Sequence, residues 1–96
     1  IMHRSTLLII LALMLVASCG DLAADRTTVE GTGQGELLKL RAGPGLGYSV
    51  ILGLPDGTAL NRSDCVTEVG QRWCRVSLTA ASRITGYVSA DYLSGG

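Results

Sequence analysis

The chain has 96 residues and carries eight basic and eight acidic side chains, so its formal net charge is zero. This length allows one small domain, and the balanced charge argues against a nucleic-acid-binding protein, which needs a basic surface. A domain this small buries little apolar surface and usually needs a covalent or metal cross-link. The apolar residues, 47% of the chain, are unevenly spread, with eleven in succession at Leu7–Ala17.

The apolar run predicts that residues 1–18 are a signal peptide. Basic residues precede the run and small residues follow it, which is the pattern of an export signal. The run is too short for a membrane-spanning helix, which needs about 20 apolar residues. The sequence Val16-Ala17-Ser18-Cys19 resembles a bacterial lipobox, and that resemblance implies a lipid on Cys19. The alternative is an ordinary export signal cut nearby, for instance after Ala24, which would discard Cys19.

Residues 19–26 are predicted to form the lipidated cysteine and a short tether. The seven residues 20–26 span at most about 25 Å when fully extended, so the domain would stay close to the membrane. In the sorting rule that accompanies the lipobox resemblance, a residue other than Asp after the cysteine permits delivery to the outer membrane, and Gly20 meets this condition. The expected location is therefore the periplasm or cell envelope, with a lipid anchor in the outer membrane.

Two further cysteines, Cys65 and Cys74, are predicted to form a disulfide. An even pair in an exported chain favours a bridge, and the eight residues between them suit facing positions of a hairpin. Two free thiols are the alternative. A metal site is not expected, because the sole histidine, His3, lies in the signal and two cysteines cannot complete a tetrahedral zinc site. No cofactor is expected either.

The rest of the chain predicts strands separated by turns rich in Gly and Pro. Alternation of apolar and polar residues is clear at Leu38–Arg41 and at Trp73–Leu78. Including these two, the predicted strands are residues 27–30, 38–41, 50–54, 58–62, 73–78 and 84–88, with a loop between the two cysteines. Five or six short strands of this kind predict an all-β domain, a small closed sheet with few exposed edges.

Four motifs, in order, resemble a bacterial SH3 (SH3b) domain. They are Leu38–Gly45 (LKLRAGPG) followed by Tyr48, Leu54–Thr58 (LPDGT), Trp73–Val76 (WCRV) and Gly86–Leu93 (GYVSADYL), with Thr28–Gly31 fitting a preceding first strand. The resemblance covers about residues 27–94. It implies an SH3-like barrel of five or six strands, preceded here by the signal helix. It also implies binding of peptides or cell-wall material, since such domains often act as targeting modules.

Catalysis is not expected. The sole histidine lies in the signal, the paired cysteines would be oxidised, and the carboxylates are scattered along the chain. No catalytic residue is therefore assigned, and the protein is expected not to be an enzyme.

The candidate ligand-binding residues are aromatic or charged: Tyr48, Trp73, Tyr92, Asp91 and Arg41. Alternation along the strand places Trp73 on the outer face, where we expect it to be exposed as a recognition surface. By the resemblance, the three aromatic residues border a peptide groove. Asp91 or Glu68 would pair with a peptide amine and Arg41 with a carboxylate. The structural alternatives are that both tyrosines only close the barrel ends and that Arg41 is a solvated charge.

Two functions remain open after this reasoning. The first is a lipid-anchored module that binds peptidoglycan, through its peptide stems, in an aromatic groove. The second is an interaction or assembly factor whose groove or sheet edge docks an extended peptide of another envelope protein. In both cases we expect a monomer that contacts the membrane through its lipid and does not bind nucleic acid.

Overall fold

The computed structural model describes residues 25–95. The predicted signal helix, Cys19 and most of the predicted tether lie outside the described residues. Asp25 and Arg26, assigned above to the tether, instead belong to the first strand. Within residues 25–95, no helix has both the length and the apolar character needed to cross a membrane.

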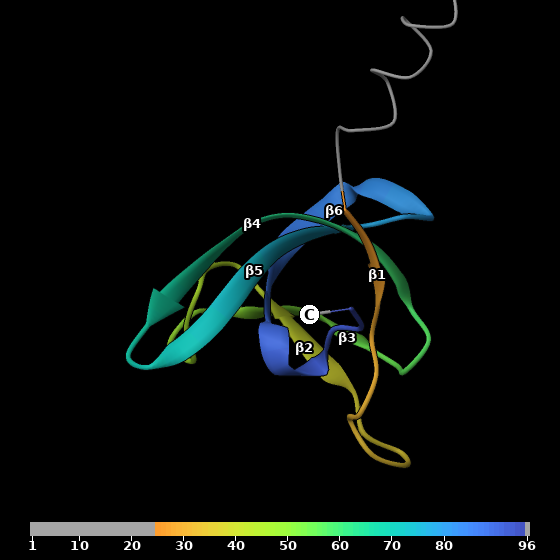
Figure 1. The fold of residues 1–96 in the computed structure, drawn as a ribbon, viewed down its shortest axis with the longest axis horizontal. Coiled ribbons are helices and arrows are strands. Elements are labelled where there is room, and N and C mark those ends of the chain that lie inside the picture. Colours follow the sequence, from red (N-terminus) through yellow and green to blue (C-terminus); the bar gives the residue numbers. More distant parts are fainter. Residues whose placement is uncertain (1–24, 96) are drawn as a thin grey trace, which may run out of the picture.

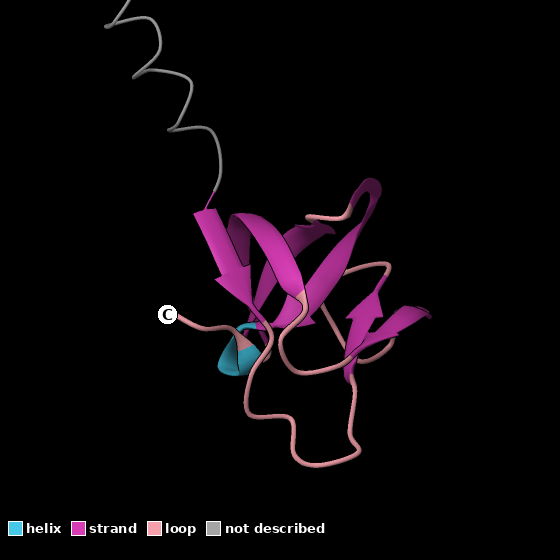
Figure 2. Ribbon diagram, turned by 90° about the vertical axis from the view of Figure 1, so that its right-hand side faces the viewer, coloured by secondary structure: helices cyan, strands magenta, loops and turns pink. Residues whose placement is uncertain are grey.

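The described chain forms a strongly bent antiparallel sheet followed by one short helical turn (Figures 1 and 2). The elements are β1 (Asp25–Thr28), β2 (Leu38–Arg41), β3 (Val50–Leu54), β4 (Ala59–Glu68), β5 (Gln71–Leu78), β6 (Ala81–Ser89) and the 3₁₀ turn η2 (Ala90–Tyr92). The strands are ordered β1-β4-β5-β6-β2-β3. The predicted all-β, SH3-like barrel of five or six strands is confirmed, and it has six strands.

The strand boundaries differ most around the two cysteines. The loop predicted between Cys65 and Cys74 is wrong, because β4 continues to Glu68 and pairs with β5 as far as the Glu68–Gln71 partners. Ser63 and Asp64, just before Cys65, lie at an irregularity in the register between Arg62 and Cys65. Such a bulge bends a strand without ending it.

A small apolar core fills the barrel. Its buried members are Val29, Leu38, Leu40, Leu54, Leu60, Cys74, Val76, Val88 and Leu93. Inward positions recur every second residue, as at Leu38 and Leu40 on β2, because successive side chains of a strand point to opposite faces. The core contains residues of every strand from β2 to β6. It also contains Val29, which follows β1, and Leu93, which follows η2.

The two ends of the described chain pair with each other. Val29 forms an isolated bridge with Leu93, and the Ser94 N–H donates to the Thr28 carbonyl at 2.9 Å. The buried Thr27 hydroxyl donates to the Ser94 carbonyl at 2.7 Å, which satisfies a polar group that burial would otherwise penalise. The segment after η2 is thereby held against β1.

The predicted closed sheet is wrong in one respect, because the barrel stays open between β1 and β3, the two ends of the strand order. Val50 and Ile51 of β3 are exposed by 48% and 50%. An unpaired strand edge with apolar side chains is a template on which another strand can add.

The disulfide between Cys65 and Cys74 is formed in the structure. The two residues are direct partners in the β4–β5 ladder, with their Cα atoms 4.0 Å apart. Cys74 is fully buried in the core, and Cys65 packs against it. The bridge therefore serves both as a cross-link and as part of the apolar core.

Reduction of this disulfide should lower the free energy of unfolding by about 2–3 kcal/mol, because the bridge restricts the unfolded chain. Urea unfolding of the oxidised and reduced protein measures the difference, with a thiol count to verify each state. Equal unfolding midpoints for the two states would contradict the predicted role of the bridge.

Candidate functional site

A groove with a cavity volume of about 690 Å³ crosses one face of the barrel. One wall is the loop 42–49, the opposite wall is the tip of the β4–β5 hairpin, and η2 closes one side. The lining residues are Pro44, Gly45, Leu46, Gly47, Tyr48, Glu68, Val69, Gln71, Trp73, Ser89, Asp91 and Tyr92. The groove continues into a second depression of about 280 Å³, which shares Leu46, Trp73, Ser89 and Tyr92 with the first.

Trp73 lies at the floor of this groove. Its neighbour Cys74 points into the core, so the indole points to the opposite face, as the alternation predicted. The predicted exposure was wrong, because Trp73 is only 5% exposed. Leu46 and Tyr92, from distant parts of the chain, line both depressions together with it. Trp73 thus offers a ligand a small accessible area at the base of the groove.

The indole N–H of Trp73 is available in the groove. No hydrogen bond from Trp73 is seen, and among residues 25–95 no buried side-chain nitrogen or oxygen lacks a hydrogen-bond partner. The N–H therefore belongs to the accessible part of the indole. An indole nitrogen can only donate, so its natural partner in a ligand is a carbonyl oxygen.

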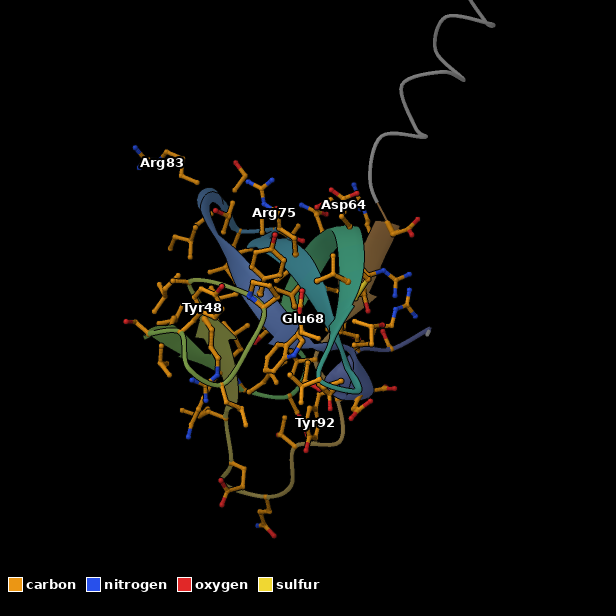
Figure 3. The ribbon with its side chains drawn as sticks, turned by 90° about the vertical axis from the view of Figure 1, so that its left-hand side faces the viewer. Tyr48, Asp64, Glu68, Arg75, Arg83 and Tyr92 are labelled. Atoms are coloured by element: carbon orange, nitrogen blue, oxygen red, sulfur yellow. A yellow bond between two sulfur atoms is a disulfide. The ribbon has the colours of Figure 1, made fainter. Side chains whose placement is uncertain are left out.

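Tyr48 stands on the loop wall, half exposed at 51%. Its ring lies so close to Gly43 that a Cβ atom at this position would overlap it. Because Gly43 has no Cβ atom, the Tyr48 ring can pack directly against the backbone of the Gly43-Pro44-Gly45 motif. In Figure 3, Tyr48 and Tyr92 are both labelled on the face that carries the groove, with Glu68 between them in this view.

Arg41 holds the loop wall in place. Its guanidinium Nη1 donates to the carbonyls of Leu46 at 3.2 Å and Tyr48 at 3.0 Å. The structure thus gives Arg41 a different role from the two weighed on sequence, a ligand contact or a solvated charge. Although Arg41 also lines the second depression, its hydrogen bonds are to the protein's own backbone. Arg41 is a positioning residue for Tyr48.

The opposite side is fixed through η2. Ser89 caps this turn, accepting from the Asp91 N–H at 3.4 Å, and also accepts from the Gln71 side chain at 2.9 Å. The Tyr92 carbonyl accepts from the Glu30 N–H at 2.9 Å. These contacts fix Asp91 and Tyr92 relative to the hairpin, with the Tyr92 side chain 38% exposed.

Charge is unevenly distributed along the groove. The charged residues that line the first depression are Glu68 and Asp91, both acidic and exposed. The charged residues that line the second depression are Lys39, Arg41 and Glu36. The groove therefore has an acidic part near the hairpin tip and a mixed part near β2.

The structure brings together all five residues predicted from sequence, Tyr48, Trp73, Tyr92, Asp91 and Arg41, along this groove. The sequence analysis missed Leu46, Val69, Gln71 and Ser89 as lining residues. Their positions depend on the loop and on the hairpin register rather than on a motif. Within residues 25–95, no group of three or more His, Cys, Asp or Glu side chains could hold a metal ion.

The chain matches the family model described as Bacterial SH3 domain over residues 36–94. This match covers more than half of the chain and includes every residue that lines the first depression. Searches of curated proteins and of solved structures give no match.

Replacement of Arg41 by Met should loosen the loop wall, because it removes the two hydrogen bonds to backbone carbonyls and keeps an apolar stem. We expect amide hydrogen exchange in residues 42–49 to accelerate about fivefold, as loss of roughly 1 kcal/mol of local stability implies. Arg83→Met is the matched control, since this exposed arginine projects from the far end of β6 (Figure 3). Unchanged exchange in Arg41→Met would refute the positioning role.

Proposed function

Because the chain belongs to the bacterial SH3 domain family, we propose that it is a non-enzymatic binding module of the cell envelope that holds peptidoglycan by its peptide stems. The observation that carries this proposal is the groove between the loop 42–49 and the β4–β5 hairpin, with aromatic residues on its floor and sides. Domains of this family commonly bind cell-wall material, and this groove is the surface we assign to that task.

The groove has the features that an extended peptide requires. Tyr48 and Tyr92 offer flat apolar surfaces, and the Trp73 N–H offers a donor for a peptide carbonyl. The groove lies at the surface, so an extended ligand can keep part of its backbone hydrated. A peptide stem of peptidoglycan meets these conditions.

The acidic part of the groove suits a ligand amine. Asp91 and Glu68 line the first depression, and no basic residue lines it with them. An ammonium group there would form charge-assisted hydrogen bonds with either carboxylate. Arg41 contributes indirectly by holding Tyr48, and Lys39 in the second depression is the lysine that a ligand carboxylate could reach.

A lipid on Cys19 would hold this module at the membrane. The proposal rests on the signal pattern of residues 1–18 and on the lipobox-like sequence before Cys19. The disulfide supports export, because such bridges persist in oxidising compartments. The groove would then face the wall from the outer membrane.

A second candidate function is docking of another exported protein. The open edge of β3, with Val50 and Ile51 exposed, favours addition of an extended peptide as a further strand. Under this alternative the protein is an assembly factor in the envelope, and peptidoglycan is not its ligand.

Binding of the oxidised protein to purified sacculi tests the first function. We expect wild type to sediment with sacculi and Tyr48→Ala to bind about tenfold more weakly, because the ring supplies a large contact area. Asp91→Asn should bind about threefold more weakly, and acetylation of the sacculus amines should abolish this difference.

Two matched variants control this experiment. Ile51→Ala removes an apolar side chain as exposed as Tyr48 but outside the groove, and Asp64→Asn removes an exposed charge outside it. Both should bind like wild type. Absence of wild-type binding to sacculi would exclude the first function and favour docking of a protein partner.

Lipidation predicts a specific mature form. Intact mass of the membrane-extracted protein should show an N-terminus at Cys19 with attached acyl chains, and Cys19→Ala should move the protein to the soluble fraction. An N-terminus beyond Cys19 would exclude the anchor and leave the binding function open.

A further inference from the structure

The tip of the β4–β5 hairpin has an unusual residue at its sharpest point. The strands pair up to Glu68 and Gln71, so Val69 and Gly70 alone make the turn. Both have positive φ, 50° for Val69 and 76° for Gly70. Two central residues with positive φ define a type I′ turn, whose twist matches that of the hairpin.

Valine is poorly suited to this position. The first residue of a type I′ turn is usually Asn, Asp or Gly, and a β-branched residue with positive φ is strained. Among the described residues other than glycine, Val69 is the one with positive φ. Its side chain is fully exposed, with a relative accessibility of 103%, so contacts within the domain do not compensate for the strain.

Val69 also lines the groove, on the wall opposite Tyr48. An exposed aliphatic side chain beside a binding groove gains free energy only when a ligand covers it. Asn, Asp or Gly would form the same turn with less strain than Val69. A strained residue that the fold does not require indicates a functional role. The strain, the exposure and the position at the groove thus favour the same interpretation.

We propose that Val69 is a ligand contact, which packs against an aliphatic side chain of the bound peptide next to the amine held by Glu68 or Asp91. This inference rests on the proposed peptide-binding function and specifies it further. The ligand class becomes a peptide that carries a small aliphatic group beside a free amine. The hairpin tip is then the part of the groove that selects among peptides.

The test measures stability and binding in the same variants. Val69→Asn should raise the Tm by about 4–8 °C, because Asn-Gly is the preferred type I′ pair, and should weaken binding to purified sacculi about fivefold. Val69→Ala should weaken binding by a similar factor without a comparable rise in Tm, since it shortens the side chain but keeps a residue that disfavours positive φ.

Val66→Thr is the matched control, because this valine of β4 is also exposed, at 39%, but does not line the groove. It should leave binding unchanged. If wild type binds sacculi and both Val69 variants bind equally well, the contact is refuted while the proposed function stands. A fall in Tm for Val69→Asn would refute the strain argument. If wild type does not bind sacculi, the proposed function fails and this inference fails with it.

Discussion

The structure depends on two adjacent residues of β5 that face in opposite directions. Cys74 enters the core and is bridged to Cys65, whereas Trp73 forms the floor of the groove. Because Trp73 and Cys74 are adjacent on one strand, the backbone fixes the position of each relative to the other. The disulfide that stabilises the core therefore also positions Trp73 at the floor of the groove. A small domain has few apolar contacts available for this purpose, which explains why the bridge lies directly behind the groove.

The general architecture followed from local patterns. Alternation at Leu38–Arg41 and at Trp73–Leu78 correctly indicated strands and their inward faces, because this period is a property of any half-buried strand. The spacing of Cys65 and Cys74 likewise predicted a bridge. The region between these cysteines was misjudged as a loop, whereas β4 and β5 stay paired there as far as Glu68 and Gln71. The bulge just before Cys65 leaves no clear sequence signal either.

The groove itself was only partly predictable. Its residues were identified through motif resemblance, but the burial of Trp73, which is only 5% exposed, does not follow from the alternation along β5. The role of Arg41 depends on the path of the loop, because its partners are backbone carbonyls, which any residue supplies. Val69 was missed for a related reason. Its significance lies in a backbone angle that its side chain does not favour.

The position of β1 indicates that the folding unit begins before the start of the family match. The family match starts at residue 36, yet β1 pairs with β4 and Val29 closes the core against Leu93. A fragment that started at residue 36 would uncover Leu60, which is fully buried in the described structure, and would leave β4 with an unpaired edge. Such a truncation would widen the opening of the barrel, which would then lie between β4 and β3. The smallest autonomous version of this domain therefore begins at Asp25 or earlier.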